Sequence, residues 1–500
     1  MDRIKVLFAS PEVVPFAKTG GLADVAGALP YALAARGHEV AVLMPRYSGL
    51  YGGKYPLTAV SVPPLSSIAG GDEPVLSFEL GGKRRPVRFV FITREEYFRR
   101  PELYRDPSTG KDWADNDERF SYFARAILQW CKQTDFRPDI IHVNDWQSAL
   151  VAPYLKLTYA DDPFFARTRT VLTVHNLAYH GQFPAERFGV LRFDERLFAP
   201  LSCFEFYGKV DFLKAGISYS DKINTVSETY AREIQSGPDL GCGLDGVLRE
   251  RTNDLYGIVN GIDYDIWSPE NDALIAANYS RNDLSGKKKN KAALMQECGF
   301  PAAAEHLPVI GVISRLDDQK GFDLIAEVAE QLLERNFLLM ILGTGHKKYH
   351  KLLEILQRQY PDKLRVFLTF DNRLAHVIEA GSDMFLMPSR YEPCGLNQLY
   401  SLKYGTVPVV RKTGGLADTV EDADPERGTG TGFVFLEYTG EALLEVIDRA
   451  LAAFANPDQW RKIMENGMRQ DFSWAASAAK YERLYEAARS APRHLPHKIT

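Results

Sequence analysis

The sequence has few cysteines and no long apolar segment. Its 500 residues include 5 cysteines, and none has the Cys-x-x-Cys spacing of zinc and redox motifs. We therefore expect neither a disulfide framework nor a structural zinc site, but a reduced, cytoplasmic protein. No apolar segment approaches the roughly 18 residues that span a bilayer, and the apolar start of the chain is too short for a signal peptide.

An excess of basic charge is also absent. Lys and Arg total 60 against 65 Asp and Glu, which gives a net charge of −5. Binding to nucleic acid or to an anionic membrane through phosphate contacts needs a basic excess, so we expect neither partner. A local basic groove could still hold a small phosphorylated ligand. A hydrophobic content of 45% is typical of a globular protein, and the length favours two or three domains.

Two series of alternating strands and helices occupy the chain. Val- and Ile-rich segments of strand length are separated by longer amphipathic segments, which predicts parallel βαβ units in an α/β fold. The expected strands of the first series are 4–9, 39–44, 139–143, 170–174 and 222–226, and those of the second are 309–313, 338–342, 364–370, 384–388 and 407–410. Helices are expected at 22–36, from 147, from 228, at 321–335 and at 475–488.

The stretch 260–307 separates the two series. It contains the basic run Lys287-Lys288-Lys289, which we interpret as a solvated helix face or a linker. We predict an N-terminal domain at 1–257 and a C-terminal domain at 258–474. No strand follows the last helix, so the segment 475–500 is free to pack elsewhere, for instance back on the first domain.

One seven-residue sequence occurs twice. Lys-Thr-Gly-Gly-Leu-Ala-Asp runs from Lys18 to Asp24 and again from Lys412 to Asp418, each time after a strand and at the start of a helix. Its glycines let backbone N–H groups approach a ligand, the helix start favours an anion, and the lysine adds a positive charge. The alternative is a helix-capping turn with a solvated lysine. Neither copy has the GxGxxG spacing, so no nicotinamide cofactor is indicated.

Two loops of the second series carry candidate binding groups at strand ends. Arg315 and Lys320 flank one short loop, where they could clamp a diphosphate, although such a pair is more often an ordinary surface loop. Glu392 follows a later strand and suits a sugar hydroxyl, or it is simply a first-turn acid favoured by the helix dipole. Cys394 has no base paired with it in the sequence, so we interpret it as a structural or pocket-lining thiol rather than a nucleophile.

Polar residues also end two strands of the first series. The segments His142–Trp146 and Val174–Asn176 each follow such a strand, and we expect them to converge on one crevice, although a single His or Trp is usually structural. Asp-x-Asp pairs at 115–117, 263–265 and 422–424 lie in turn-rich stretches. None of them belongs to a set with convincing metal-ligand spacing, so we expect no obligatory metal and no cofactor.

Four motifs together carry a resemblance to a known family. KTGGLADV, SRLDDQKG, PSRYEPCGLNQLYSLKYGT and KTGGLADTV, in this order, resemble the glycogen and starch synthases of glycosyltransferase family five, from the first strand to Tyr481. The resemblance implies the GT-B arrangement, in which two Rossmann-like domains with parallel sheets face each other across a deep cleft and a C-terminal helix crosses back to the first domain. It also implies transfer of glucose, with retention, from a nucleotide diphosphate sugar to the non-reducing 4-OH of an α-1,4-glucan such as glycogen. The KTGGLADV form favours ADP-glucose as the donor.

Motif position then implies roles for individual residues. The catalytic residues are expected to be Lys18, His175, Arg315, Lys320 and Glu392. The donor contacts are expected to be Lys18, Gly20, Gly21, Arg315, Lys320, Gly343, Thr344, Phe370, Glu392, Cys394, Gly395 and Leu396. The residues on the glucose and acceptor side are expected to be Glu12, Asp24, Tyr104, Asp145, His175 and Asn176.

Two positions differ from what many family members or related transferases carry. Phe370 stands where many members have a tyrosine stacked on adenine, and Tyr400 stands where related retaining transferases have a second glutamate. Other functions therefore stay open: a two-domain transferase that uses UDP-glucose or a small-sugar acceptor, and a glucan-binding protein without activity. A dehydrogenase is a more distant alternative, because no dinucleotide fingerprint is present.

Overall fold

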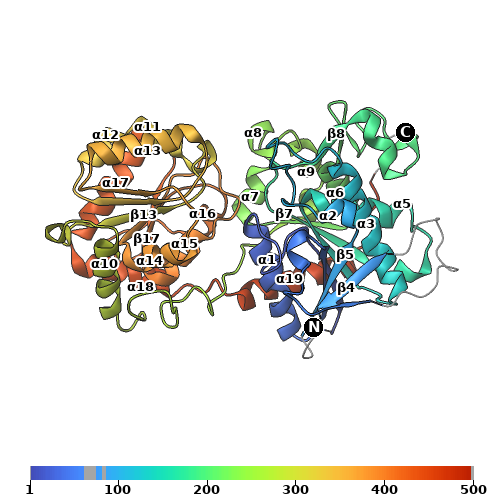
Figure 1. Ribbon diagram of the computed structural model, residues 1–500, viewed down its shortest axis with the longest axis horizontal. Helices are drawn as coiled ribbons and strands as arrows, with labels where there is room; N and C mark the ends of the chain where they lie inside the picture. The colour runs from blue at the N-terminus through green and yellow to red at the C-terminus, as the bar shows by residue number, and fades with distance from the viewer. Residues whose placement is uncertain (1, 61–74, 81–85, 497–500) are drawn as a thin grey trace. The chain divides into compact units, whose positions relative to one another are not determined.

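The computed structural model describes residues 2–60, 75–80 and 86–496. These residues form two compact units (Figure 1). Unit 1 is drawn from the segments Met1–Val226, Ala231–Gly261 and Trp474–Thr500, and unit 2 from Ser227–Tyr230 and Ile262–Ser473. The chain therefore completes unit 1 only after it has formed unit 2.

A mostly parallel sheet runs through unit 1. The order of its described strands is β12-β11-β7-β6-β1-β2-β5-β4-β3, and only β4 pairs antiparallel, with β3 and β5 at one edge. A second, small antiparallel sheet has the order β8-β10-β9. The strands are β1 Lys5–Ala9, β2 Glu39–Pro45, β3 Leu57–Ala59, β4 Leu76–Leu80, β5 Val87–Thr93, β6 Ile140–Asn144, β7 Arg169–Val174, β8 Gln182–Pro184, β9 Glu205–Phe206, β10 Lys209–Asp211, β11 Lys222–Thr225 and β12 Leu255–Gly257.

Helices cover both faces of the large sheet. In Figure 1, α1 and α19 lie together on one side of it and α3, α5 and α6 on the other. This cover explains why the central strands are buried along nearly their whole length. The helices are α1 Gly21–Ala35, α2 Glu95–Phe98, α3 Asn116–Gln133, α4 Asp145–Ala149, α5 Val151–Leu157, α6 Phe212–Tyr219, α7 Glu228–Glu233, α8 Pro238–Gly241, α9 Asp245–Glu250 and α19 Trp474–Ser490, with 3-10 turns η1 Ser48–Leu50, η2 Pro163–Phe165, η3 Ala185–Leu191, η4 Glu195–Leu197 and η5 Thr252–Asp254.

The last helix belongs to the core of unit 1. The hydroxyl of Tyr485 lies 2.8 Å from His142 Nδ1, and Asn224 Nδ2 donates a 3.2 Å hydrogen bond to the hydroxyl of Tyr481. Glu482 lies 2.8 Å from Nε2 of the buried His38. Polar groups beneath the sheet are thus satisfied by a helix that the chain supplies last.

The sheet of unit 2 is entirely parallel in its described strands, in the order β15-β14-β13-β16-β17-β18. Its strands are β13 Val309–Ile313, β14 Leu338–Leu342, β15 Leu364–Phe367, β16 Met384–Met387, β17 Val407–Arg411 and β18 Phe433–Phe435. Successive residues of β14 belong to two separate apolar clusters, one on each face of the sheet. Leu339 belongs to one cluster, and Leu338 and Met340 belong to the other. Both faces of the sheet are therefore covered.

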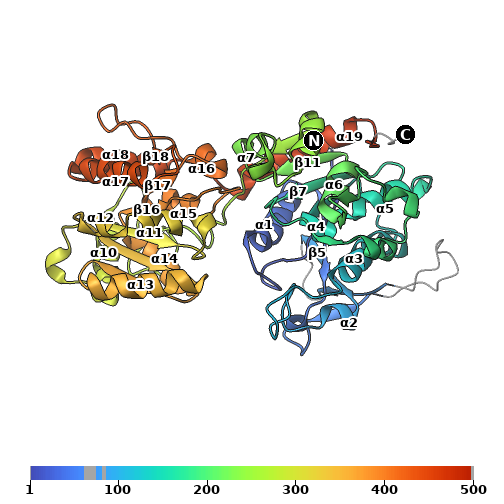
Figure 2. The ribbon, with the colours of Figure 1, turned by 90° about the horizontal axis from the view of Figure 1, so that it is seen from above.

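Figure 1 shows α11, α12 and α13 over one face of this sheet and α10 and α14 over the other, and Figure 2 shows α17 and α18 beside β18. The helices are α10 Ser285–Glu297, α11 Phe322–Glu327, α12 Ala329–Glu334, α13 Lys347–Gln359, α14 Asn372–Gly381, α15 Asn397–Tyr404, α16 Gly414–Thr419, α17 Gly440–Phe454 and α18 Pro457–Met468, with 3-10 turns η6 Ala302–Ala304 and η7 Asp318–Lys320.

Two expectations about unit 2 are wrong. The single helix expected at 321–335 is broken at Val328 into α11 and α12, where α17 packs so closely that a Cβ on Gly440 would lie 2.3 Å from Val328 Cγ1. In the basic run, Lys288 and Lys289 are exposed on α10 as expected, but Lys287 is buried, and its Nζ donates hydrogen bonds to Thr406 Oγ1 and to the carbonyl oxygen of Glu379. Burial lowers the pKa of Lys287 to about 7.

Candidate functional site

In unit 2 the predicted donor residues gather at the carboxyl edge of the sheet. Arg315 follows β13, Gly343 follows β14, Phe370 follows β15 and Glu392 follows β16. Because all of these strands are parallel, their carboxyl ends meet at one edge, which is where open α/β sheets bind ligands. We refer to these residues and their neighbours as the unit 2 half-site.

A buried ion pair lies at the centre of the unit 2 half-site. Lys320 Nζ lies 2.6 Å from Glu392 Oε2, and the Ser389 hydroxyl donates a 3.0 Å hydrogen bond to the same oxygen. Glu392 is only 4% exposed. A buried carboxylate is costly without partners, and the lysine and the serine supply the partners that the burial of Glu392 requires.

The turn that carries Lys320 is fixed by its own hydrogen bonds. The Asp317 carboxylate accepts a 3.0 Å hydrogen bond from the backbone N–H of Lys320, which caps η7. The backbone N–H of Arg390 donates to the carbonyl oxygen of Gln319 at 2.9 Å, so the η7 turn and the Glu392 loop are joined directly. Lys320 is therefore aimed at Glu392 by backbone contacts on both sides.

Arg315 lies at the start of the same loop but faces solvent. Its side chain is 55% exposed, lies 3.1 Å from Asp317 Oδ2 and donates a 3.0 Å hydrogen bond to Gln319 Oε1. An exposed pair of this kind contributes only about 0–1 kcal/mol to stability. Its guanidinium can therefore turn to a bound anion at little cost.

The two glycines that follow β14 serve chain packing. A Cβ on Gly343 would lie 1.9 Å from the carbonyl oxygen of Ser314, and one on Gly345 would lie 2.4 Å from that of Leu316. These glycines let the two loops lie against each other. Thr344, between them, is exposed, and its Oγ1 lies 3.5 Å from His350 Nε2.

The second copy of the repeat supports the Glu392 loop. A Cβ on Gly414 would lie 2.0 Å from the carbonyl oxygen of Glu392, and one on Gly415 would lie 2.0 Å from that of Cys394. The backbone N–H of Gly415 donates a 3.0 Å hydrogen bond to the Glu392 carbonyl oxygen. Both copies open a helix, as predicted, but this copy is filled by the protein's own backbone.

The residues after Glu392 form a tight turn into α15. Cys394 is buried, Gly395 has a φ of +71°, and Leu396 is the residue before the helix begins. A left-handed φ favours glycine at position 395. The turn brings the start of α15 to the same edge as the buried ion pair.

Two aromatic positions have different surroundings. Phe370 is 81% exposed, so its ring is open to a planar ligand at the edge of unit 2. Tyr400 is buried and stacks on Trp267 with ring centroids 3.9 Å apart, and the same indole stacks on His376 at 3.7 Å. Position 400 is thus part of an aromatic stack within unit 2, where a carboxylate would lose this packing.

In unit 1, Glu12 connects the first glycine loop to Tyr104. Its carboxylate accepts hydrogen bonds from the backbone N–H groups of Thr19 and Gly20, from the Thr19 hydroxyl, and from the Tyr104 hydroxyl at 2.7 Å. Glu12 is itself buried. Two N–H groups that could hold a ligand phosphate therefore hold a carboxylate of the protein in this structure.

The remaining residues of the first glycine loop are open. Lys18 Nζ lies 2.7 Å from Asp24 Oδ1, and both side chains are partly exposed. No atom of the described protein lies within 4 Å of a Cβ built on Gly20, whose φ of −151° is extended. Gly21 is the first residue of α1. The two identical sequences thus have opposite surroundings, since the first copy is open where the second is filled.

Asp145, His175 and Asn176 do come together. The Asp145 carboxylate accepts hydrogen bonds from the backbone N–H groups of both His175, at 2.7 Å, and Asn176. Asp145 has a φ of +52°, and His175 Nε2 lies 3.0 Å from Asn144 Oδ1. We refer to these residues, with Glu12, Tyr104 and the first glycine loop, as the unit 1 half-site.

Three ionisable groups of the unit 1 half-site have strongly shifted pKa values. Burial raises the pKa of Asp145 to about 7, although two backbone N–H groups favour its charged form, and the nearby Glu12 raises it further. Burial lowers the pKa of His175 to about 3, so its imidazole is neutral at pH 7. The pKa of Tyr104 is well above its usual value, because of burial and the Glu12 charge. Such shifts are typical of functional sites.

Some positioning residues were not among the predicted site residues. Asn144 orients His175, Ser389 and Gln319 hold the Glu392 loop, and Thr19 ties Glu12 to the glycine loop. Each of these residues lies inside a sequence segment described above, but the segment alone did not indicate a role for it. His142 is structural instead: its Nε2 lies 2.7 Å from Thr173 Oγ1 and its Nδ1 contacts α19.

Two of the three Asp-x-Asp pairs are engaged by arginines, and in the third the Asp263 carboxylate accepts a 2.9 Å hydrogen bond from the backbone N–H of Asp265. Arg100 binds Asp115, Arg187 binds Asp117, and Arg449 binds Asp422. Among the described residues, no three His, Cys, Asp or Glu side chains gather so that they could hold a metal ion. In the same part of the chain, every helix is too short or too polar to cross a membrane.

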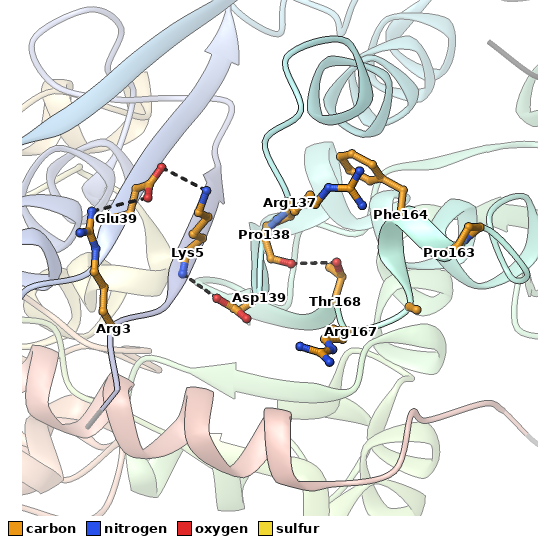
Figure 3. A pocket seen from close by; sticks show the side chains of 11 residues that line it. Arg3, Lys5, Glu39, Arg137, Pro138, Asp139, Pro163, Phe164, Arg167 and Thr168 are labelled. Atoms are coloured by element: carbon orange, nitrogen blue, oxygen red, sulfur yellow. Dashed lines mark hydrogen bonds and ion pairs between the residues drawn. The ribbon is translucent and has the colours of Figure 1, made fainter. Parts of the chain in front are cut away.

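A cavity of about 640 Å³ lies elsewhere in unit 1. Figure 3 shows its lining residues at the amino ends of β1, β2, β6 and β7, the sheet edge opposite to the unit 1 half-site. Among its charged groups, Arg3 and Lys5 are paired with Glu39. None of the predicted site residues lines it.

Comparison with solved structures defines the class of protein. The catalytic domain of starch synthase IV from Arabidopsis thaliana, solved bound to ADP and acarbose, matches with a TM-score of 0.87 and 33% identity, over 98% of this chain and 100% of that chain. Sucrose-phosphate synthase from Thermosynechococcus elongatus matches with a TM-score of 0.58 and 19% identity, over 97% and 99%, which shows the fold alone. The fold is that of the GT-B glycosyltransferases, with two Rossmann-like domains and parallel sheets.

Sequence comparison narrows the class to a family. The model of the starch synthase catalytic domain matches residues 5–250, and that of the group 1 glycosyl transferases matches residues 300–467. A glycogen synthase from Koribacter versatilis is 47% identical over 493 residues, which is 98% of this chain and 99% of the relative. The chain belongs to the glycogen and starch synthase family, as the four motifs predicted.

Proposed function

We propose that this chain transfers glucose from ADP-glucose to the non-reducing 4-OH of glycogen or another α-1,4-glucan, with retention at the anomeric carbon. Family membership supports the reaction, and so do relatives named glycogen synthase and a structure solved with ADP and acarbose. The observation that carries the proposal is the Lys320–Glu392 pair, buried at the carboxyl edge of a parallel sheet with Arg315 in the same loop.

The unit 2 half-site would hold the donor. A diphosphate needs concentrated positive charge, which Lys320 and the freely turning Arg315 supply. Glu392 accepts from Lys320 and Ser389 and keeps acceptor capacity for a hydroxyl of the donor glucose. The exposed ring of Phe370 would stack on the base.

The unit 1 half-site would act on the glucose and the acceptor. Its groups include a neutral histidine, a carboxyl that titrates near pH 7 and an amide, all suited to hydroxyl groups of sugars. Tyr104 offers a ring against which a glucan residue could lie. Lys18, 48% exposed, would add its charge to the donor phosphates.

The chemistry follows from charge and proton balance. The bond from the anomeric carbon to the diphosphate oxygen breaks, and a bond to the acceptor 4-OH oxygen forms on the same face. The departing diphosphate takes the hydroxyl proton, so no protein nucleophile is needed. Lys320 and Arg315 stabilise the charge that develops on the diphosphate, and the unit 1 half-site positions the acceptor.

We also propose that the reaction takes place in the cytoplasm. All five cysteines are free thiols, which is typical of a reducing compartment. One of them, Cys394, lies buried beside the Glu392 loop. Glutathione and thioredoxin would keep that thiol reduced.

The test is release of nucleotide from ADP-glucose and, separately, from UDP-glucose, with and without glycogen and with a chelator present. The proposal expects glycogen-dependent release of ADP that survives chelation. Release only from UDP-glucose would keep the reaction and overturn the donor. Release without a glucan primer would point to a small acceptor or to hydrolysis, and no release from either donor would favour a glucan-binding protein.

A further inference from the structure

The segment between α2 and α3 carries Tyr104, and we refer to its residues 99–115 as the Tyr104 loop. The loop folds back on itself: Arg105 forms an antiparallel bridge with Asp112, and the backbone N–H of Trp113 donates a 3.0 Å hydrogen bond to the carbonyl oxygen of Tyr104. A side chain on a loop is positioned less precisely than one on a helix or a strand, unless neighbouring residues lock the loop. The neighbours of the Tyr104 loop therefore decide how well its phenol is placed.

Arg119 of α3 holds the peptide that precedes Tyr104. Its side chain is fully buried, and its guanidinium donates hydrogen bonds to the carbonyl oxygens of Tyr97, at 2.7 Å, and Leu103, at 3.0 Å. Tyr97 belongs to α2, and Leu103 directly precedes Tyr104 in the chain. One guanidinium on α3 therefore ties α2 to the Tyr104 loop.

Asn116, at the start of α3, holds the peptide that follows Tyr104. Its Nδ2 donates a 3.1 Å hydrogen bond to the carbonyl oxygen of Tyr104, and its Oδ1 accepts a 2.5 Å hydrogen bond from Arg119. Asn116 is buried as well. The carbonyl groups on both sides of Tyr104 are thus held from α3, one by Arg119 directly and the other by an amide that Arg119 orients.

These contacts give the Tyr104 phenol one position. Its hydroxyl donates the 2.7 Å hydrogen bond to Glu12, and its ring packs at a tilt against Phe120, with centroids 6.1 Å apart. Phe120 follows Arg119 on α3 and is buried, whereas Tyr104 is partly exposed. Two adjacent residues of one helix therefore set the backbone and the ring of Tyr104, and the ring stays open to a ligand.

Arg119 is buried without a carboxylate partner. Its three acceptors are two backbone carbonyls and an amide oxygen, and it forms no salt bridge with any residue that the structure describes. Burial of an unpaired charge is costly. Arg251, another buried arginine of unit 1 that binds backbone carbonyls, is paired with Asp254 at 3.0 Å. The chain thus keeps a costly cation at the place where its hydrogen bonds fix the Tyr104 loop.

We propose that Arg119 is a positioning residue for the glucan acceptor and that it acts through Tyr104, by fixing the loop so that the phenol ring faces the acceptor. The role rests on the proposed function, because Tyr104 matters in this way only if a glucan binds beside it. Since the candidate donor residues Arg315, Lys320 and Glu392 belong to unit 2, loss of Arg119 should weaken acceptor binding and leave donor binding unchanged.

The test compares Arg119→Met with Arg251→Met in the full-length chain. Methionine is long and apolar but donates no hydrogen bond, so both variants leave buried carbonyl groups without a donor and should lower the melting temperature. Only Arg119→Met should raise the KM for glycogen, by about ten-fold or more, because a small misplacement of a positioning group is costly. The KM for ADP-glucose should stay at the wild-type value. A glycogen KM that rises equally in both variants, or in neither, would overturn the proposal.

A double-mutant cycle shows whether Arg119 acts through Tyr104. If it does, Tyr104→Ala should raise the KM for glycogen at least as much as Arg119→Met does. The variant with both substitutions should then be no worse than Tyr104→Ala alone. Losses that multiply in the double variant would show two independent roles and would overturn the proposal.

Asn116→Asp tests the same contacts if Arg119→Met does not fold. The aspartate keeps an acceptor for Arg119, but it has no N–H for the carbonyl oxygen of Tyr104. The KM for glycogen should therefore rise several-fold while the KM for ADP-glucose does not change. An unchanged glycogen KM in this folded variant would overturn the proposal.

Failure of the proposed function is a separate outcome, which the wild type reveals. If the wild type releases no ADP with glycogen, the proposed function is wrong, and binding of maltoheptaose in the absence of donor then tests the role of Arg119. Titration calorimetry measures this binding. Weaker binding by Arg119→Met than by Arg251→Met would support the positioning role, and equal binding would overturn it.

Discussion

At the scale of one residue, a substitution of Arg315 should change activity without changing stability. Its side chain is mostly exposed and its ion pair is of the weak surface kind, so Arg315→Ala should barely change the melting temperature. If the guanidinium stabilises charge on the departing diphosphate, turnover should fall by on the order of 100-fold. Steady-state kinetics with ADP-glucose and glycogen, with calorimetric melting of the same samples, measure both.

The matched control for Arg315 is Arg461. It is similarly exposed and lies 2.8 Å from Glu465 on α18, away from the sheet edge where the candidate residues gather. Arg461→Ala should leave both turnover and melting temperature unchanged. Equal kinetics in the Arg315 and Arg461 variants would contradict the diphosphate role.

Phe370 tests stacking on the base. Aromatic–base stacking contributes about 1–3 kcal/mol, so Phe370→Ala should raise the KM for ADP-glucose by about ten-fold, whereas Phe370→Tyr should not. Because the ring is largely exposed, the loss should not reduce stability. Leu436→Ala, at another exposed apolar residue of unit 2, is the control. An unchanged KM in Phe370→Ala would remove this residue from the donor contacts.

Asp145 should titrate near pH 7. Its raised pKa means that the folded protein keeps a proton that the unfolded chain loses near pH 4, so the stability contribution of this carboxyl falls as pH rises from about 4 to 7. Across this pH range the free energy of unfolding should fall by about 4 kcal/mol, since each of the three pKa units corresponds to about 1.4 kcal/mol. A ¹³C-aspartate titration should show one carboxyl with a midpoint near pH 7 that is missing in Asp145→Asn. A midpoint below 5 would contradict the burial argument.

At the scale of elements, the repeated sequence shows how far a motif predicts structure. Both copies start a helix, because glycine and the backbone geometry at a helix start are local properties. Their opposite surroundings depend on which loop packs against each copy, and that is a tertiary property. Sequence therefore predicted where these loops lie, but not that Gly414 and Gly415 support Glu392 while Gly20 stays open.

This contrast gives a paired prediction. Gly415→Ala places a methyl group against the backbone of Cys394, so the Glu392 loop must shift, and the melting temperature should fall by several degrees, corresponding to about 2 kcal/mol or more. Gly20→Ala meets no atom and has an extended φ, so it should melt as the wild type does. Scanning calorimetry compares the two. Equal melting temperatures in the two variants would contradict this account.

The buried strands were predicted better than the edge elements and helix details. Segments such as 309–313 and 338–342 match β13 and β14 residue for residue, because a strand covered on both faces is a short, continuous apolar run. β3 and β4 were not predicted, because they are antiparallel strands at the sheet edge with partly exposed residues. β5 is an exception among the buried strands, since it was not predicted either. The break at Val328 and the burial of Lys287 depend on distant partners, Gly440 and Thr406, which no local pattern reveals.

At the scale of the whole molecule, unit 1 depends on a helix that the chain makes last. Tyr485 and Tyr481 satisfy His142 and Asn224 beneath the sheet, so a chain that ends at residue 473 would leave buried polar groups without partners. Unit 2 is nearly continuous: apart from Ser227–Tyr230, it is the segment Ile262–Ser473. The two units should therefore differ in whether they can fold alone.

The segment 262–473 should fold by itself and bind ADP. It keeps Arg315, Lys320, Phe370 and Glu392, and loses mainly the hydrogen bonds that Asp418 accepts from Ser227 and Thr229. It loses only the contribution proposed for Lys18, so its ADP affinity, measured by titration calorimetry, should be within about ten-fold of that of the full chain, a difference of about 1.4 kcal/mol. Lys18→Ala in the full chain should weaken ADP by a similar factor. A folded fragment that does not bind ADP would contradict this prediction, because it would show that nucleotide binding requires more of unit 1 than the charge of Lys18.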